Sequence, residues 1–260
     1  MGFKTLLFDL NDGVATVTLN RPDVLNAVNM DMRMDFTALV DELFYNDDIR
    51  LVVFTGAGRG FSSGGDMAHF EQDWLTPNFR ANSRRLVKFF DDLEALEKPV
   101  LCAVNGPATG AGLELALACD LRIASEAATF GFRENYIGLI PGVGGCARFI
   151  RTIGVAKAKE LIWMGTMIPA EEAKSIGLVN KVVPHETLMD ATYDLARTLL
   201  KRAPQAIGMA KKLLNTIANV DQTSGIAVEG LAQSILIKTE DHNEGVKAFR
   251  EKRKPQYRGR

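Results

Sequence analysis

The chain has 260 residues, 47% hydrophobic and 24% charged, which is typical of a globular protein and excludes a disordered chain, a collagen and a small disulfide-rich protein. The three cysteines lie far apart without a CxxC pair, so they indicate neither a disulfide framework nor a thiolate zinc site. The formal net charge is −1, so the sequence does not predict a general nucleic-acid-binding surface. Residues 247–260 contain seven Lys or Arg and one Glu, and this basic end could bind a phosphate group.

The beginning of the chain has a strand pattern instead of a signal or transit segment. No stretch approaches the ~20 apolar residues that cross a membrane. We therefore expect a cytoplasmic protein without a membrane partner.

The first predicted element is a β-hairpin. Apolar residues alternate over 6–10 and 15–19, on either side of a turn that favours positive φ at Gly13. The pattern then predicts a helix over 29–45 and a buried strand over 51–56.

The rest of the chain alternates strands and helices and then becomes helical. Strands are predicted at 99–106 and 121–125, and helices at 79–97, 111–119, 155–164, 169–176, 185–201, 204–218, 224–237 and 239–251. This order indicates an α/β fold. The simplest division is a core of residues 1–203 followed by a helical region of residues 204–260.

Three glycine clusters follow predicted strands, at 56–65, 106–112 and 142–145, and indicate close approaches of the backbone to another group. The first is not a dinucleotide-binding GxGxxG, because Phe61 stands where the third glycine is needed. It is not a Walker A loop either, because Asp66 and the next residue replace the Lys and the Ser or Thr.

Serine and histidine patterns give weaker signals. The GxSxG pattern at 60–64 allows Ser62 as a nucleophile with His185 or His242 as its base, but we favour a tight glycine-rich turn. No HExxH motif is present, so no metal site is predicted. His69 is interpreted as a solvated loop histidine, with a position lining a pocket as the alternative.

Two glutamates stand out because their neighbours are apolar. Glu114 lies in a helix that is otherwise apolar, where burying an unpaired carboxylate costs several kcal/mol. Glu134 precedes a glycine-rich helix start expected at Gly142. A buried salt bridge from Glu114 to Arg122 and a surface pair of Glu134 with Arg133 are the purely structural alternatives.

Five motifs give a more specific signal together: GFSSGGD (60–66), AVNG (103–106), GAGLELAL (110–117), FGFRE (130–134) and GLIPG (138–142). With these motifs the whole chain resembles the enoyl-CoA hydratase/isomerase (crotonase) family. The resemblance implies a spiral of repeated ββα turns with a C-terminal helical trimerisation region. It also implies a homo-oligomer, either a trimer or a dimer of trimers.

The resemblance assigns an acyl thioester carbonyl to two backbone N–H groups, those of Gly65 and Ala111. The residue types fit this role, because Ala111 begins a predicted helix with free N–H groups and Gly65 has no side chain to block an approach. Hydratases of the family split water with two glutamates, which correspond to Glu114 and Glu134, whereas isomerases often keep only the second. Either glutamate can be the acid or the base.

The resemblance also implies contacts to substrate and CoA. Phe249 and Lys252 correspond to positions at the nucleotide end of CoA bound by a neighbouring subunit. The other positions expected to bind substrate or CoA are Asn26, Ala27, Ser63, Gly64, Asp66 and Met67.

The sequence departs from the family pattern in three places. Ala111 replaces a more usual glycine, which narrows the space beside the carbonyl, and Met67 and Ala68 stand where many hydratases have an aliphatic residue and Lys, so that one CoA phosphate contact is missing. Phe132 and Arg133 replace Gln-Pro, and this last change puts a preference for simple short acyl groups in doubt. A bulky or cyclic acyl group would fit the aromatic residues Phe70, Trp74, Phe79 and Phe132, and packing in the core explains these residues equally well.

The sequence therefore predicts an enoyl-CoA hydratase that adds water reversibly to the α,β double bond of an acyl-CoA. CoA belongs to the substrate, and no metal or redox cofactor is expected. The alternatives are a double-bond isomerase, an acyl-CoA thioester hydrolase and a CoA-binding protein without catalysis.

Overall fold

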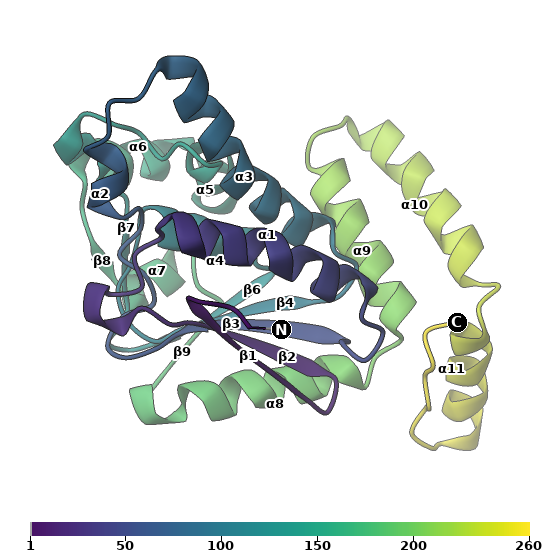
Figure 1. Ribbon diagram of the computed structural model, residues 1–260. Helices are drawn as coiled ribbons and strands as arrows, with labels where there is room; N and C mark the ends of the chain where they lie inside the picture. The colour runs from purple at the N-terminus through teal and green to yellow at the C-terminus, as the bar shows by residue number, and fades with distance from the viewer. Residues whose placement is uncertain (1) are drawn as a thin grey trace.

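In the computed structural model, which describes residues 2–260, the chain begins with the expected hairpin of β1 (Leu6–Asn11) and β2 (Val14–Leu19) (Figure 1). Asp12 and Gly13 connect the two strands with φ of 49° and 80°. Positive φ at both positions matches the right-handed twist of an antiparallel pair. The predicted positive φ at Gly13 is confirmed, and Asp12 has a positive φ as well.

A six-stranded sheet continues from this hairpin. Its order is β1-β2-β3-β4-β6-β9, antiparallel between β1 and β2 and parallel from β2 onward. The added strands are β3 (Leu51–Gly56), β4 (Val100–Val104), β6 (Leu121–Ser125) and β9 (Lys181–Val183).

Helices cover both faces of this sheet. Val52 and Phe54 of β3 pack toward α1 (Met30–Tyr45), α3 (Thr76–Ala95) and α4 (Ala111–Ala118). Leu51 and Val53 point the other way, toward α8 (Leu188–Leu200), which lies below the sheet in Figure 1. Burial on both faces explains why the parallel strands are continuously apolar.

A second sheet of three very short strands places the loops near α4. It consists of β5 (Ala108–Thr109), β7 (Thr129–Gly131) and β8 (Ile168–Pro169). Two successive turns of the chain give one strand to each sheet and then a helix: β4, β5 and α4, followed by β6, β7 and α5 (Gly145–Ile153). Ser62 pairs with Ala108 in the same way after β3. This is the ββα spiral that the sequence resemblance implied.

Several helix starts differ from the sequence expectation by two or three residues, namely those of α3, α5, α8 and α10 (Gln222–Leu236). α3 begins at Thr76 instead of residue 79, with Pro77 in its first turn. The helix start expected at Gly142 lies at Gly145, because Gly144 has a φ of 103° and ends the preceding loop. The remaining short elements are η1 (Pro22–Val24), α2 (Met67–Phe70), η2 (Glu134–Ile137), α6 (Val155–Met164), α7 (Ala170–Ser175) and η3 (His185–Thr187).

Three helices end the chain: α9 (Pro204–Ile217), α10 (Gln222–Leu236) and α11 (Glu240–Glu251). α9 lies against α3, where Lys211 donates to the carbonyl of Leu93 at 2.8 Å. α10 and α11 extend away from the body of the molecule (Figure 1). The division at residue 204 stays a prediction.

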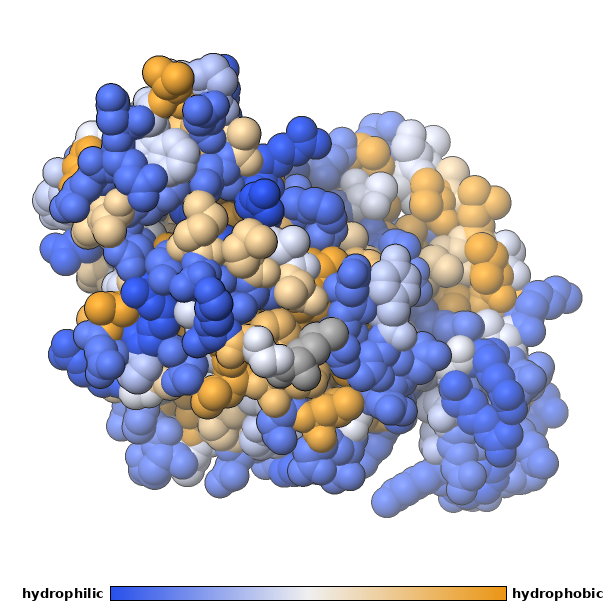
Figure 2. Space-filling model, in the orientation of Figure 1, coloured by the Kyte–Doolittle hydropathy of each residue, from blue (hydrophilic) through white to orange (hydrophobic). Residues whose placement is uncertain are grey.

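Exposed apolar side chains gather on α10, among them Ile226, Leu231 and Ile235. Figure 2 shows orange surface at the right, where Figure 1 places α10, above the strongly hydrophilic surface of α11. Among the helices of residues 2–260, none combines the length and apolarity that crossing a membrane requires.

Candidate active site

The glycine-rich loop after β3 is stabilised by hydrogen bonds from buried polar side chains. Ser62 donates from Oγ to the carbonyl of Asn26 at 2.8 Å and accepts from the N–H of Gly64 at 3.2 Å. Asn26 in turn donates from Nδ2 to the carbonyls of Ala57 and Gly60, both at 2.9 Å. The side chains of Asn26 and Ser62 therefore shape the loop.

This loop passes closely over the beginning of α4. A Cβ on Gly64, whose φ is 92°, would lie 2.8 Å from the carbonyl oxygen of Thr109 and 3.3 Å from the nitrogen of Ala111. Glycine is thus required by both the backbone conformation and the available space. The contact brings Gly65 beside the N-terminus of α4.

Two backbone N–H groups are left free at this contact. Across residues 2–260, neither Gly65 nor Ala111 donates its N–H to a protein acceptor. Ala111 is the first residue of α4, where N–H groups lack partners inside the helix and favour negative charge. The pair can polarise a carbonyl placed between them.

Glu114 lies one turn into α4 and is only 2% exposed. Its Oε1 accepts from the N–H of Val143 at 2.9 Å and from that of Gly145 at 2.8 Å. Burial raises the pKa of Glu114 to about 7, an effect that the nearby Glu134 carboxylate increases and the two N–H groups oppose.

Glu134 begins η2 and brings a second carboxyl group to the same place. A Cβ on Gly110 would lie only 3.0 Å from Oε1 of Glu134, so this carboxyl lies directly against the turn before α4. Its Oε2 is buried and has no hydrogen-bond partner within residues 2–260. Burial also raises the pKa of Glu134.

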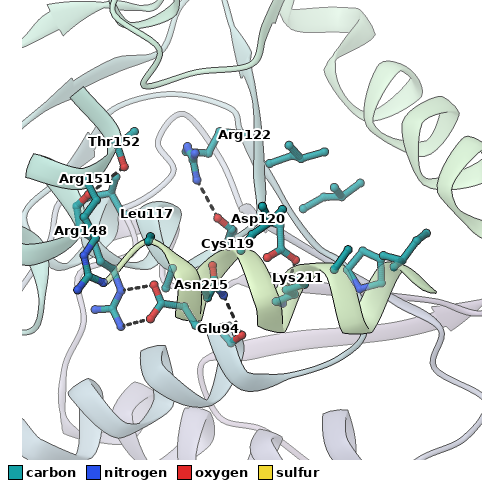
Figure 3. A pocket seen from close by; sticks show the side chains of 18 of the residues that line it. Glu94, Leu117, Cys119, Asp120, Arg122, Arg148, Arg151, Thr152, Lys211 and Asn215 are labelled. Atoms are coloured by element: carbon teal, nitrogen blue, oxygen red, sulfur yellow. Dashed lines mark hydrogen bonds and ion pairs between the residues drawn. The ribbon is translucent and has the colours of Figure 1, made fainter. Parts of the chain in front are cut away.

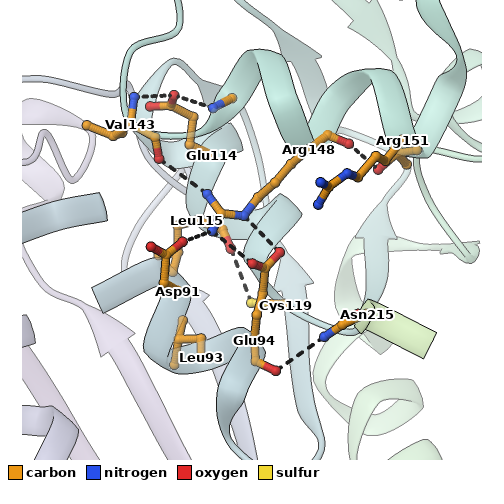
Figure 4. Close-up of polar contacts among 12 residues, drawn as sticks. Asp91, Leu93, Glu94, Glu114, Leu115, Cys119, Val143, Arg148, Arg151 and Asn215 are labelled. Atoms are coloured by element: carbon orange, nitrogen blue, oxygen red, sulfur yellow. Dashed lines mark hydrogen bonds and ion pairs between the residues drawn. The ribbon is translucent and has the colours of Figure 1, made fainter. Parts of the chain in front are cut away.

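Arg148 supports the loop that holds Glu114 (Figure 4). Its guanidinium binds Asp91 at 2.7 Å and Glu94 at 2.8 and 2.9 Å, all on α3, and donates to the carbonyl of Val143 at 3.3 Å. The positive charge of Arg148 lowers the pKa of Glu114. Arg148 thus acts on the carboxyl both through the loop and through its charge.

The free N–H groups and both glutamates line one cavity of about 310 Å³. Ser63 and Met67 line it near the glycine loop, and Phe70 and Phe79 add aromatic surface. Its mouth and other walls include Arg33, Ser83, Arg133, Ile137, Leu139 and Ile140. This arrangement can hold a carbonyl group next to two titratable carboxyls.

A larger hollow of about 550 Å³ lies between α9 and the C-terminal ends of α4 and α5 (Figure 3). Its charged groups are engaged within the protein: Lys211 pairs with Asp120 at 2.9 Å, Arg148 pairs with Glu94, and Arg151 donates to the side chain of Asn219. Arg122 donates to the backbone carbonyls of Leu178, Ala116 and Cys119. Because its charges are satisfied internally, we place the chemistry in the smaller cavity.

Several residues predicted to bind substrate or CoA lie outside the lining of this cavity. Asp66 pairs with Arg21 at 2.9 Å and caps α2 by accepting from the N–H of Ala68, while Arg21 also donates to the carbonyl of Ala27. Gly64 supplies the close approach described above. Phe249 lies exposed in the last turn of α11 and Lys252 directly follows this helix, and neither lines the cavity of its own chain.

Three interpretations from the sequence are wrong. His69 is buried among Phe70, Trp74 and Phe79 instead of solvated. Of the two explanations for the aromatic residues, core packing holds for Phe132, which is buried against Phe149, and neither Phe132 nor Trp74 lines the cavity.

The other two concern charge pairs. Arg122 donates to backbone carbonyls, so Glu114 has no salt bridge with it. Arg133 lies over the ring of Tyr136 at 5.1 Å from its centre instead of pairing with Glu134. The alternative nucleophile Ser62 bonds only to backbone, while His185 faces Ser125.

Sequence reasoning missed Arg148, Arg33 and the two N–H donors at Val143 and Gly145. Arg148 lies shortly after the PGVGG segment, on the strongly amphipathic helix α5. Its position on the apolar side of this helix is the sequence signal that could have identified Arg148 as a buried residue. Within residues 2–260, no group of three or more His, Cys, Asp or Glu side chains is arranged to hold a metal ion.

Comparison with known proteins agrees with this geometry. Residues 9–260 match the sequence profile of a family described as enoyl-CoA hydratase/isomerase. The chain is 40% identical to the Bacillus subtilis protein YngF, named as an enoyl-CoA hydratase/isomerase, over 100% of both chains. It is 38% identical to a short-chain-enoyl-CoA hydratase of Clostridium acetobutylicum, over 98% of this chain and 97% of the other.

The fold is shared as well. The crystal structure of an enoyl-CoA hydratase from Bacillus anthracis superposes with a TM-score of 0.94 at 35% identity, covering 99% of this chain and 100% of that one. The expected crotonase-type α/β fold is confirmed. The chain therefore belongs to the enoyl-CoA hydratase/isomerase family.

Proposed function

We propose that this protein adds water reversibly to the α,β double bond of an acyl-CoA thioester. One observation carries the proposal: Glu114 and Glu134 line a single cavity together with the free N–H groups of Gly65 and Ala111. Hydratase names among the relatives support the same reaction.

In this proposal the thioester carbonyl accepts hydrogen bonds from Gly65 and Ala111. These donors are fixed before substrate arrives, so they stabilise the negative charge that develops on oxygen when the β carbon is attacked. One such donor is typically worth about 2.7–4 kcal/mol of transition-state stabilisation.

Glu114 and Glu134 supply the proton transfers. One ionised carboxylate takes a proton from water as the water oxygen bonds to the β carbon, and the other, protonated carboxyl gives a proton to the α carbon. Raised pKa values in both groups support a pair that holds one proton near neutral pH. This scheme uses no metal or redox cofactor.

The nature of the acyl group and the assembly belong to the proposal too. Phe70 and Phe79 give the cavity the aromatic surface that a bulky or cyclic acyl group would contact. Phe249 and Lys252 are proposed to reach the CoA nucleotide of a neighbouring subunit in a trimer or dimer of trimers. We propose a cytoplasmic location.

Incubation with crotonyl-CoA tests the reaction by comparing formation of 3-hydroxyacyl-CoA with release of free CoA. We expect the wild-type protein to form 3-hydroxyacyl-CoA. The rate of hydration should be roughly 10²–10⁴-fold lower in both Glu114→Gln and Glu134→Gln, because glutamine keeps the shape of glutamate but cannot exchange the proton. Binding of a saturated acyl-CoA should change little, and the exposed Glu126→Gln is the matched control.

Three results would contradict this proposal. Full hydration by Glu114→Gln would indicate a single-carboxylate isomerase. Release of CoA as the main product would indicate a thioester hydrolase. Binding without turnover of any enoyl-CoA would indicate a non-catalytic protein.

A further inference from the structure

Arg33 is a buried cation in the wall of the active cavity. It lies in the first turn of α1, lines the cavity together with Phe79 and Ser83 of α3, and is only 5% exposed. Its Nη1 donates to Oδ1 of Asn82 at 2.6 Å. Its Nε is buried and has no partner anywhere in residues 2–260.

No carboxylate of the described chain compensates this charge. The acidic residues nearest in sequence are engaged elsewhere: Asp31 pairs with Lys4, and both backbone and side chain of Thr5 donate to Asp35. Burial lowers the pKa of Arg33, and no acidic neighbour offsets this effect. An uncompensated buried charge is costly, so proteins normally pair it.

The neighbouring His69 does not provide the missing negative charge. Burial and the positive charge of Arg33 both lower the pKa of His69, which keeps the imidazole neutral near pH 7. Its Nε2 is also buried without a partner in the described chain. Arg33 in the cavity wall and the nearby His69, which does not line the cavity, thus each leave a polar atom unpaired.

We propose that Arg33 binds a carboxylate on the acyl group, so that the substrates are α,β-unsaturated acyl-CoA thioesters of dicarboxylic acids. This inference rests on the proposed function. A guanidinium suits the role because its planar edge donates two parallel hydrogen bonds to one carboxylate, and Asn82 holds the opposite part of the group in place. The substrate carboxylate supplies the counter-ion that the protein lacks.

Paired substrates of equal chain length test this assignment. Hydration rates are compared for pent-2-enedioyl-CoA against pent-2-enoyl-CoA, and for hex-2-enedioyl-CoA against hex-2-enoyl-CoA. We expect kcat/KM to favour the carboxylate in at least one pair by roughly 10- to 10²-fold, the size of a charged hydrogen bond. In Arg33→Met this ratio should fall to one or below, and Arg33→Lys should keep part of it.

Arg133→Met is the matched control, because it removes an exposed positive charge from the same cavity. It should keep the ratio, which separates a specific contact at Arg33 from a general attraction of anions. Circular dichroism checks that each variant is folded. A wild-type preference for the uncharged acyl groups, or an unchanged ratio in Arg33→Met, would overturn the proposal.

Binding of saturated ligands keeps this test independent of the reaction. Calorimetry with glutaryl-CoA against pentanoyl-CoA, and adipyl-CoA against hexanoyl-CoA, should show a tighter Kd for one dicarboxylic ligand only when Arg33 is present. Tighter binding of a dicarboxylic ligand that depends on Arg33, in a protein that hydrates no enoyl-CoA, would contradict the proposed function but support the carboxylate site. Equal affinities in every pair would contradict the carboxylate site whatever the turnover.

Discussion

Burial of the Glu114 side chain affects both the acidity of its carboxyl group and the stability of the fold. Its carboxyl is almost completely enclosed, and two N–H groups at 2.8 and 2.9 Å only partly replace the water that it loses on folding. A pKa of about 7 is the result. The same burial that would suit the group to the proposed proton transfer makes its ionised form unfavourable for the fold.

This conflict predicts a pH-dependent gain in stability for Glu114→Gln. Between pH 4.5 and 7 the folded wild type keeps a proton that the unfolded chain has lost, so its free energy of unfolding falls as the pH rises through this window. Glutamine cannot ionise and can still accept both N–H bonds. We expect the variant to be more stable than wild type by on the order of 2 kcal/mol at pH 8 and nearly equal at pH 4.5.

Urea unfolding at the two pH values, followed by circular dichroism at one protein concentration, measures this difference. The other glutamate and all remaining groups are common to both proteins. An equal difference at pH 4.5 and pH 8 would show that the substitution acts through packing and not through ionisation.

Some residues of the site could be predicted from the sequence, and others could not. Glu114 and Glu134 could be named because an acid among apolar residues is visible in the sequence alone, and the resemblance gave Gly65 and Ala111. Arg33 and Arg148 could not, because each acquires its role from partners 49 to 57 residues away in the chain. Only the folded arrangement shows that one is paired and the other is not.

At the level of elements, the N-terminus of α4 carries the most function. It offers the free N–H of Ala111, receives the close approach of Gly64 and presents Glu114 one turn later. Gly110, with a φ of 53°, lets the chain turn into this helix next to Glu134. Three parts of the site thus depend on eight residues of helix.

Ala111→Pro tests the donor at this helix start. Proline is tolerated in the first helical turn because its missing N–H has no partner there, so the helix should persist while the carbonyl loses one donor. We expect turnover to fall by about 10²-fold or more. Ala111→Gly is the matched control, since it keeps the N–H and should remain active in a crotonyl-CoA assay.

A folded Ala111→Pro variant with wild-type turnover would remove Ala111 from the site. Circular dichroism and the melting temperature establish folding for both variants before their rates are compared.

Long elements could be predicted from the sequence, and very short ones could not. The strand over 51–56 coincides with β3, and the helix predicted over 29–45 differs by one residue from α1. β5, β7 and β8 have two or three residues each, too few to show an alternating pattern. These short strands nevertheless build the second sheet and fix the loops around the cavity.

At the scale of the whole molecule, α10 and α11 lack the packing that the body provides. The tail after α11 folds back along it, where Asp241 accepts from the N–H groups of Arg258 and Gly259 at 2.7 and 2.8 Å. Glu244 binds Arg253, and Glu240 binds Arg260. The basic end is therefore partly neutralised by acids on α11 itself.

Removal of residues 241–260 tests the proposed role of this end. We expect the truncated chain to lose its oligomeric state and to bind CoA more weakly, because the apolar face of α10 and the Phe249 and Lys252 positions would act together across subunits. Size-exclusion chromatography with light scattering and calorimetry with CoA measure the two effects. A truncated monomer with unchanged affinity for CoA would place nucleotide binding elsewhere.

α3 links one wall of the cavity mechanically to the support of Glu114. Phe79, Asn82 and Ser83 in its first half form or support the wall that is proposed to meet the acyl group, while Asp91 and Glu94 in its second half hold Arg148. A helix transmits displacement along its axis almost rigidly. Laboratory evolution toward a larger acyl group that tilts α3 will therefore also shift the support of Glu114, so variants with broader scope should recover speed through secondary substitutions near Asp91 and Glu94.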